Sequence, residues 1–175
     1  MHEPDPTLVH RARDGDAAAF DEIVRLLRGP VLRYAEHLVR DHALAEDITQ
    51  ETFVRCHRNI ARFESHGKFT TWIVSIAHNA GVDAMRARDR HARAWSRTPQ
   101  PPPPSDPAVR AELRSALASL PARLRESLLL VEVTGLSYAE AAEVIGIPAG
   151  TVKSRVFNAR KRLARWFAEG HDDAM

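Results

Sequence analysis

A proline-rich segment, TPQPPPPSDP at residues 98–107, constrains this chain more than any other feature, because six of its ten residues are proline. Proline lacks a backbone N–H and has a fixed φ, so the segment cannot lie within a helix or an inner strand. Such a run behaves as an extended and fairly stiff spacer. We therefore expect the 175-residue chain to divide into two small modules joined by this linker.

Both modules show apolar residues at helical spacing, and neither shows a convincing strand pattern. The predicted fold class is therefore all-α, with two small helical domains. Residues 7–96 form the first, 97–107 the linker and 108–168 the second, which contains a helix-turn-helix. Hydrophobic residues make up 44% of the chain, which is enough to build a core in each domain.

In the first domain, Asp16 is suited to cap a helix. Gly29-Pro30 is expected to interrupt that helix, and a second helix then begins at Val31. A third helix is predicted over roughly 42–57. Its small and apolar side holds Ala45, Ile48, Thr49, Thr52, Phe53 and Cys56. Its other side carries Asp47, Gln50, Glu51 and Val54 at i, i+3, i+4 and i+7. A solvated surface is the simplest explanation of this second side.

A loop, NIARFESHGKF at residues 59–69, leads into a fourth predicted helix. Phe63 and Phe69 are either the walls of a pocket or anchors in the core, and Trp72 is expected in the core. The C-terminal end of the helix is strongly basic and carries Arg86, Arg88, Arg90, Arg93 and Arg97.

The second domain begins with an N-cap at Asp106 and proline at the first helical position. The apolar stripe predicted for this helix holds Val109, Leu113, Ala116, Leu117 and Leu120. The next helix is expected to turn Leu124, Leu128 and Val131 inward. Further on, Ser137 and Glu140 have the spacing of a capping box, which predicts a short helix from about residue 138.

The segment GTVKSRVFNARKRL, residues 150–163, carries five basic residues and no acidic one. One side of the helix that it predicts is the apolar stripe Val152, Val156, Ala159 and Leu163. The opposite side carries Lys153, Ser154, Phe157, Asn158 and Lys161. A short capped helix, a tight turn and a basic amphipathic helix together indicate a helix-turn-helix.

In a helix-turn-helix, the second helix enters the DNA major groove and its exposed N-terminal residues read bases. Lysine can donate to guanine, asparagine can pair with adenine, and phenylalanine can contact a thymine methyl group. Arginine and lysine at the remaining positions suit phosphates, which add affinity without sequence information. These are Arg155, Arg160, Lys161 and Arg162. A surface helix with a solvated charged side is the simpler alternative.

Several quoted stretches, taken together, resemble the extracytoplasmic-function group of bacterial sigma-70-family factors. LSYAEAAEVIGIPAGTVKSRVFNARKRL resembles region 4 of that family, its promoter-binding C-terminal domain. GDAAAFDEIV, AEDITQETFVR and FTTWIVSIAHNAGVDAMRARDR resemble consecutive parts of region 2. The resemblance covers nearly all of residues 10–166, with its motifs in the order of the family.

The resemblance implies a sigma factor that confers promoter recognition on core RNA polymerase and assists melting of the −10 element. Asp47, Gln50 and Glu51 would then contact the clamp helices of the largest polymerase subunit. The loop 59–69 would receive a flipped base of the single-stranded −10 element, with Phe63 as a candidate pocket wall. The residues implied to contact promoter DNA from the following helix are Asn79, Arg86, Arg88 and Arg90. The linker would thread the RNA-exit path of the polymerase.

The implied readers of the double-stranded −35 element are Lys153, Ser154, Phe157 and Asn158, with Arg155 and Lys161 beside them. Asn158 stands where several relatives have arginine, which predicts a preference for adenine over guanine at one position. His78 stands where the family often has a basic or aliphatic residue. DNA contact near His78 is therefore expected to vary with pH around the ordinary histidine pKa of about 6.5.

No phosphate loop, HExxH motif or metal-like Cys/His cluster is found in the sequence, so no enzyme activity, metal or cofactor is expected. The first residues, MHEPDPTLV, do not resemble a signal peptide, and the longest aliphatic run, residues 128–131, is far too short to span a bilayer. A cytoplasmic protein without membrane insertion is expected. Family members are often held inactive by an anti-sigma factor, which is a possible partner here.

Two other classes of protein stay open at this point. A free-standing helix-turn-helix regulator that binds operator DNA would explain the second domain equally well, but it would not explain AEDITQETF or the arginine-rich helix. An interaction adaptor built of helices is disfavoured by the clustered basic residues in both domains.

Overall fold

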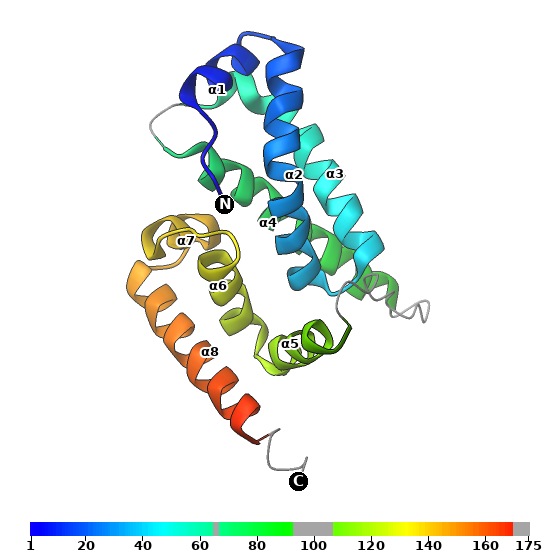
Figure 1. Ribbon diagram of the computed structural model, residues 1–175, viewed down its shortest axis with the longest axis vertical. Coiled ribbons are helices and arrows are strands. Elements are labelled where there is room, and N and C mark those ends of the chain that lie inside the picture. The colour runs from blue at the N-terminus through cyan, green and yellow to red at the C-terminus, as the bar shows by residue number, and fades with distance from the viewer. Residues whose placement is uncertain (65–66, 93–106, 170–175) are drawn as a thin grey trace. The chain divides into compact units, whose positions relative to one another are not determined.

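The computed structural model describes residues 1–64, 67–92 and 107–169, and the chain divides into two compact units, Met1–Pro102 and Pro103–Met175 (Figure 1). Every element in the described residues is a helix, which confirms the predicted all-α fold class. Residues 97–106 of the proline-rich linker, with the cap at Asp106 and Arg97, lie outside the described residues, as does Arg93, whereas Pro107 begins the next helix.

The first unit contains α1 (Pro6–Arg13), α2 (Ala17–Val39), α3 (His42–Asn59), a 3-10 turn η1 (Ile60–Arg62) and α4 (Phe69–Ala92). Helices α2, α3 and α4 pack against one another, and α1 lies against α2 and η1 (Figure 1). Side chains of all three long helices meet in the core. The largest that are fully buried include Tyr34, Phe69, Ile23, Leu27 and Ile73.

The rotation of α3 follows the sequence pattern. Its buried residues are Ala45, Ile48, Thr49, Thr52, Phe53 and Cys56, which is the whole of the predicted inward side. The hydroxyls of Thr49 and Thr52 donate to the carbonyls of Ala45 and Ile48, each at 2.7 Å, so two polar side chains are satisfied inside the core. Cys56 is fully buried, and burial raises the pKa of its thiol to about 12.

The expected break at Gly29-Pro30 is wrong, because α2 runs unbroken past Pro30 to Val39. Pro30 removes one backbone hydrogen bond, but the buried side of the helix continues through it. The buried residues before and after Pro30 keep one helical stripe: Ile23, Leu27, Val31, Tyr34, Ala35 and Leu38. Burial of this stripe on both sides of Pro30 therefore outweighs the local cost of a proline.

Helices α2 and α4 approach closely at Gly81. A Cβ atom at this position would lie 2.5 Å from Cδ2 of Leu38, which is itself buried. Residue 81 therefore allows α4 to lie against α2 at a distance that a larger side chain would increase.

The second unit contains α5 (Pro107–Ser119), α6 (Ala122–Glu132), α7 (Tyr138–Ile145) and α8 (Ala149–Glu169). Helices α6 and α7 both pack on α8, and α5 contacts it as well (Figure 1). The core of this unit is formed by residues from each helix, among them Ala116, Leu120, Leu129, Val152 and Val156.

Two predictions about α5 and α6 differ from the structure. Leu113 is 39% exposed although the stripe placed it inward, while Ala116, Leu117 and Leu120 are buried. In α6 the buried residues are four in a row, Ser127, Leu128, Leu129 and Leu130, whereas Leu124 and Val131, both predicted inward, are half-buried. This helix packs on both α7 and α8, so its buried surface is wider than one stripe.

Candidate protein and nucleic-acid interfaces

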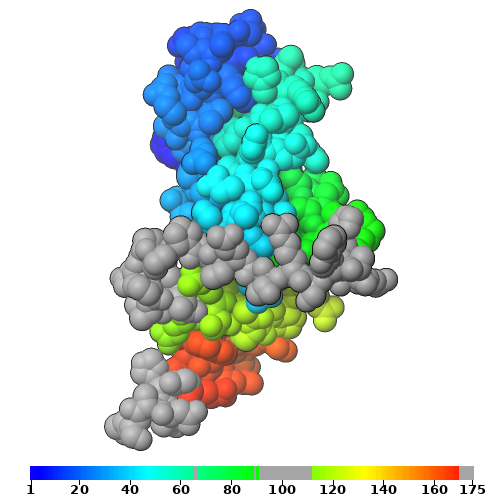
Figure 2. Space-filling view, turned by 90° about the vertical axis from the view of Figure 1, so that its right-hand side faces the viewer, coloured from blue at the N-terminus to red at the C-terminus, as the bar shows by residue number. Residues whose placement is uncertain are grey.

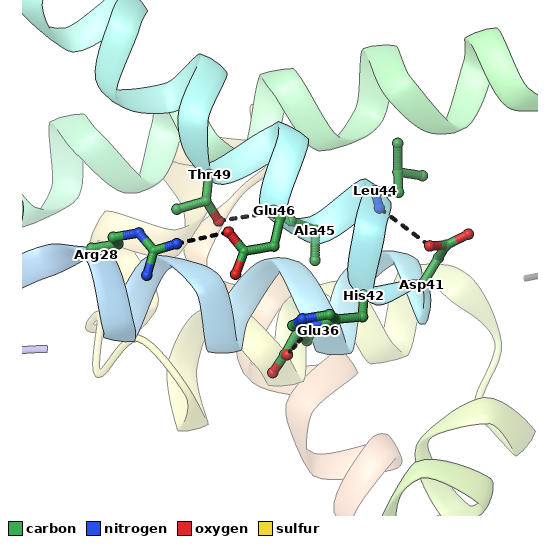
Figure 3. Close-up of polar contacts among 8 residues, drawn as sticks. All are labelled: Arg28, Glu36, Asp41, His42, Leu44, Ala45, Glu46 and Thr49. Atoms are coloured by element: carbon green, nitrogen blue, oxygen red, sulfur yellow. Dashed lines mark hydrogen bonds and ion pairs between the residues drawn. The ribbon is translucent and has the colours of Figure 1, made fainter. Parts of the chain in front are cut away.

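The beginning of α3 is fixed by contacts with α2 (Figure 3). Asp41 is the N-cap, and its Oδ1 accepts a hydrogen bond from the backbone N–H of Leu44 at 3.2 Å. Next to it, His42 Nδ1 lies 2.9 Å from Glu36 Oε1. These contacts, close to the turn between the two helices, fix where α3 begins.

A second ion pair joins α2 and α3 further along. Arg28 Nη2 lies 2.7 Å from Glu46 Oε2 (Figure 3). Both side chains are partly exposed, so the pair adds little stability by itself. Together with the buried side of α3 it sets which residues α3 presents to solvent, and α3 forms much of one surface of the first unit (cyan in Figure 2).

Asp47 and Gln50 are exposed on α3, and Glu51 is half-buried beside them. Glu51 Oε1 accepts a hydrogen bond from Arg55 Nε at 2.7 Å, and Arg55 Nη1 lies 3.7 Å from Asp83 Oδ2 on α4. The structure thus places the three predicted residues on one side of α3. We call Asp47, Gln50 and Glu51 the acidic-amide cluster.

A hollow of about 530 Å³ lies between α2 and α3. It adjoins the acidic-amide cluster, because Gln50 of that cluster is one of its lining residues. Its apolar walls come mainly from Phe20, Val24, Phe53 and Val54. The ring of His57 meets Phe20 edge to face, with centroids 4.9 Å apart. Neither Phe20 nor Val24 was predicted as a surface residue. Val54, on the polar side of α3, was a signal that this surface is not purely polar.

The aromatic residues around the end of the loop form one cluster. Phe63 and Phe69 are buried, and Trp72 is half-buried, so the core prediction for Trp72 is met only in part. The ring centroids of the three residues lie 5.2 to 5.4 Å apart. Phe63 is therefore an anchor of this cluster in the structure, and residues 65–66 of the loop lie outside the described residues.

Helix α4 carries an exposed polar stripe after its buried first half. Asn79, Asp83, Arg86 and Arg90 are exposed at i, i+4, i+7 and i+11, which places them on one side of the helix. Arg88 is half-buried, and its Nη1 donates to the backbone carbonyl of Val39 at 3.4 Å. Of the predicted α4 residues, Asn79, Arg86 and Arg90 thus share one solvent-facing side, and Arg88 points to the end of α2.

His78 does not reach solvent, which contradicts the expectation of a pH-sensitive DNA contact. Its side chain is buried, and its Nδ1 lies 3.0 Å from the hydroxyl of Tyr34. Burial lowers the pKa of His78 below its ordinary value. One position along a helix turns a side chain by about 100°, so His78 points into the core while Asn79 points out.

The helix-turn-helix is built from α7 and α8. Ser137 Oγ accepts from Glu140 N at 3.2 Å, and Glu140 Oε2 accepts from Ser137 N at 2.7 Å, so the predicted capping box is confirmed. Gly146 ends α7 at φ 68°, a conformation that favours glycine. The chain then turns through Ile147 and Pro148 into α8.

Helix α8 separates its apolar stripe from its polar side as the sequence predicted. Val152, Val156 and Ala159 are buried, and Leu163, the fourth residue of the predicted stripe, is half-buried. The residues on the opposite side are all exposed, and we call them the recognition side: Lys153, Ser154, Phe157, Asn158 and Lys161. Phe157 is 66% exposed, the largest exposure among the large apolar side chains of the described residues.

Two arginines of α8 contact α6. Arg155 Nη1 lies 4.0 Å from Glu126 Oε2, and burial raises the pKa of the Glu126 carboxyl. Arg160 Nε donates to Glu132 Oε1 at 3.1 Å. Arg155 was predicted among the DNA contacts, and in the structure its side chain is less exposed than those of the recognition side.

A second hollow, of about 420 Å³, extends the recognition side toward the C-terminal end of α8. It is lined by Asn158 and Lys161 together with Arg162, Arg165 and Trp166, and Ser119 of α5 and Glu169 complete it. Arg165 and Trp166 were not predicted as site residues. The basic residues of this hollow suit an anionic ligand such as a nucleic-acid backbone.

Within the described residues, no group of three or more His, Cys, Asp or Glu side chains could hold a metal ion. None of the helices in this part of the chain is long and apolar enough to cross a membrane.

Comparisons with known proteins give consistent results for both units. The family model of Sigma-70 region 2 matches residues 23–91, and that of Sigma-70, region 4 matches residues 110–163. The first match includes the acidic-amide cluster and the stripe of α4, and the second includes the recognition side.

Two curated relatives match most of the chain. The ECF RNA polymerase sigma factor SigE of Mycolicibacterium smegmatis is 35% identical over 95% of this chain and 69% of its own length. The RNA polymerase sigma-H factor of Pseudomonas aeruginosa is 32% identical over 92% of each chain. A solved structure of the sigma factor RpoE in complex with the anti-sigma factor NepR, from Bartonella quintana, matches with a TM-score of 0.77. It is 28% identical over 85% of this chain and 96% of its own.

Proposed function

This chain belongs to the sigma-70 family of RNA polymerase sigma factors, within the ECF group, and on that basis we propose how its two units divide promoter recognition. The first unit docks on core RNA polymerase and engages the −10 element. The second unit binds the −35 element. The chain acts as a sigma factor in transcription initiation, and the roles of individual residues are our proposal.

The acidic-amide cluster is the proposed contact with the clamp helices of the largest polymerase subunit. Exposed Asp47 and Gln50 and half-buried Glu51 present acceptors that suit a basic partner helix. The apolar hollow beside them, lined by Phe20 and Val54, offers space for an apolar side chain of the same partner. A charged cluster next to an apolar hollow supports a protein interface more than a solvated surface.

The stripe of α4 is the proposed contact with promoter DNA near the −10 element. Asn79, Arg86 and Arg90 face solvent together, so a single strand passing along α4 can meet an amide and two guanidinium groups. Asp83 lies in the same stripe, and its contact with Arg55 offsets its negative charge. Arg88 and Phe63 are placed differently: we assign Arg88 to the junction with α2 and Phe63 to support of the loop.

The recognition side of α8 is the proposed reader of the −35 element. Lys153, Phe157 and Asn158 supply a donor, an apolar contact and a bidentate amide, which are the side chains that distinguish base edges in the major groove. Lys161, Arg162 and Arg165 follow on the same side and suit phosphates. The contact of Arg155 with Glu126 supports a role in holding α8 against α6.

The proposed partners are core RNA polymerase and promoter DNA. The similar structure of RpoE was solved with the anti-sigma factor NepR, which supports an anti-sigma factor as a further partner of this chain. RNA synthesis is carried out by the polymerase, so we expect no catalytic activity of this chain and place its action in the cytoplasm, where transcription occurs.

The observation that carries the proposal is the presence of both regions in one chain. A free-standing regulator requires only a helix-turn-helix, whereas residues 23–91 match region 2 and carry the acidic-amide cluster on an exposed side of α3. This favours a polymerase subunit over the regulator.

Run-off transcription with bacterial core RNA polymerase tests the proposal. Promoter DNA from the host should give specific transcripts only when the protein is added. The double variant Asp47→Ala/Glu51→Ala should weaken these transcripts and reduce the affinity for core polymerase. Loss of the Glu51–Arg55 pair should cost only about 0.3–0.5 kcal/mol of stability, so the variant should stay folded.

The matched control is Asp21→Ala/Glu22→Ala, which removes two exposed acidic side chains from α2 of the same unit. It should leave core binding and transcripts unchanged. DNA binding by the protein alone, without any core-dependent transcript, would instead favour the free-standing regulator.

A further inference from the structure

The first turn of α4 is capped by a carboxylate that lies 66 residues earlier in the chain. The backbone N–H of Phe69 donates to Glu3 Oε1 at 2.5 Å, and the N–H of Thr70 donates to Glu3 Oε2 at 3.1 Å. The hydroxyl of Thr70 also donates to Oε2. Both oxygens of Glu3 therefore bind free donors at the helix N-terminus, where the helix dipole favours a negative charge.

The local sequence cannot provide this cap. Lys68 occupies the cap position, because its carbonyl accepts a hydrogen bond from Trp72 N at 3.2 Å. A lysine side chain carries only donors, and Gly67 before it has no side chain, so neither residue can accept the N–H groups of the first turn. Glu3 supplies the acceptor that serine, threonine, aspartate or asparagine would supply at residue 68.

The segment that carries Glu3 is itself held in place. Pro4 is buried, and Asp5 caps α1 through a 2.7 Å hydrogen bond from the N–H of Thr7. Helix α1 packs on η1. A small hollow of about 100 Å³ has walls from both segments, which are Glu3, Pro4, Pro6, Val9, His10 and Arg13 on one side and Phe63, Gly67 and Phe69 on the other. Residues 3–13, which we call the N-terminal clasp, therefore lie against both described ends of the loop 59–69.

The clasp lies outside the part of the chain that matches Sigma-70 region 2, which begins at residue 23. It nevertheless contacts both described ends of the loop 59–69, which the family resemblance implies receives a base of the −10 element. We propose that Glu3 is a positioning residue for −10 recognition, which holds the described ends of the loop by capping α4. This inference rests on the proposed function of the first unit.

The cap increases the fraction of molecules in which the first turn of α4 is folded and packed on the aromatic cluster. Phe69 gives its N–H to Glu3 and its ring to the cluster with Phe63 and Trp72, so the cap and the cluster fix the same residue. Without the carboxylate, the first turn of α4 has unpaired donors and frays more often. The affinity for the −10 strand then falls in proportion to the fraction of molecules that keep the competent arrangement.

The test uses holoenzyme assembled from the full chain and bacterial core RNA polymerase. The probe is a single-stranded −10 oligonucleotide selected by the wild-type holoenzyme from a random pool, together with its single-base variants. Glu3→Gln should weaken binding of the selected oligonucleotide roughly tenfold, because charge-assisted hydrogen bonds are lost. It should also reduce the difference in affinity between the selected oligonucleotide and its single-base variants. Affinity for core polymerase and for duplex −35 DNA should not change.

The matched control is Glu22→Gln, an equal change of charge at an exposed position of α2, and it should leave every readout unchanged. Lys68→Asn installs a local cap and is measured alone and with Glu3→Gln. If capping is the role of Glu3, the effect of Glu3→Gln should be several-fold smaller when Asn is present at residue 68. This cycle removes the effect of the lost lysine charge from the comparison.

The outcomes separate the two hypotheses. A wild-type holoenzyme without base preference in the −10 strand would refute the proposed function itself. A normal wild type with unchanged discrimination in Glu3→Gln would refute only the role of Glu3. Unfolding of Glu3→Gln seen by circular dichroism, or an equal loss of core binding, would also overturn the inference, because the clasp would then stabilise the whole unit.

Discussion

Burial separates two neighbouring residues of α4 into different roles. His78 is 5% exposed and bonded to Tyr34, whereas Asn79 faces solvent on the stripe proposed to contact DNA. Two adjacent residues thus belong to the core of the first unit and to its proposed DNA surface. Protonation of His78 is therefore expected to change the free energy of unfolding rather than a direct contact with DNA.

The lowered pKa of His78 predicts the direction of a pH effect on folding. Above the ordinary value of 6.5, histidine is neutral in both states and the full stability is present. As the pH falls through 6.5 toward the lower folded pKa, the unfolded chain binds a proton that the folded chain does not, so the free energy of unfolding falls.

Urea denaturation between about pH 7.5 and pH 5.5 should show this loss in the wild type and a smaller loss in His78→Gln. His57→Gln, at an exposed position of α3, should behave as the wild type. If the free energy of unfolding falls equally with pH in the wild type and in His78→Gln, other groups are responsible for the pH dependence.

Asn158 predicts a base preference at one position of the −35 element. Asparagine pairs bidentately with adenine and arginine with guanine, and a good pair discriminates by about 1–3 kcal/mol. Binding-site selection with the wild-type chain should give adenine at the position facing Asn158, and Asn158→Arg should change it to guanine. Guanine preferred by the wild type would contradict this assignment.

At the scale of helices, the periodicity of the sequence correctly predicted which side of a helix is buried where the helix buries a single stripe. The inward side of α3 and the stripe of α8 follow helical spacing, so the acidic-amide cluster and the recognition side could be identified by position alone. The continuity of α2 through Pro30 could not be predicted, because it depends on packing against α3 and α4 rather than on local preference.

The site residues that the sequence did not reveal depend on contacts between distant segments. Glu3 caps a helix that begins at residue 69, and no spacing rule connects the two. Phe20 belongs to α2 but lines a hollow shared with α3. Arg155 was predicted as a site residue, but its contact with Glu126 of α6 was not. Each of these requires the tertiary arrangement, whereas the capping box at Ser137 is local and could be read directly.

Two glycines in long helices should respond to alanine in opposite directions. At Gly81 a Cβ would meet buried Leu38 at 2.5 Å, so Gly81→Ala should destabilise the first unit by about 1–3 kcal/mol, less the gain in helix propensity. At exposed Gly150 in α8 nothing lies within 4 Å of an added Cβ, so Gly150→Ala should stabilise the second unit by about 0.4–1 kcal/mol. Thermal unfolding measures both, and equal shifts would rule out close packing at Gly81.

At the scale of the whole chain, each unit has its own core, with Leu27 buried in the first and Val156 in the second. The 175 residues therefore hold two cores on either side of the proline-rich segment, and each is expected to keep its own resistance to opening.

Hydrogen exchange of the full chain, followed by mass spectrometry, should show this separation. Leu27→Ala should cost about 2–5 kcal/mol and lower protection in α1 to α4, with α6 to α8 unchanged. Val156→Ala should lower protection in α6 to α8 only. A loss of protection that spreads to both units from either substitution would show that they fold as one.

The buried thiol of Cys56 is an intrinsic probe of transient opening of the first unit. It is the only cysteine in the chain, it is fully buried, and its raised pKa keeps it protonated at neutral pH. A thiol reagent can therefore react only while the first unit is transiently open, at a rate that rises with the fraction of time that this unit spends open. The rate at which Cys56 of the wild-type protein is modified therefore measures how far polymerase or promoter DNA suppresses opening of the first unit.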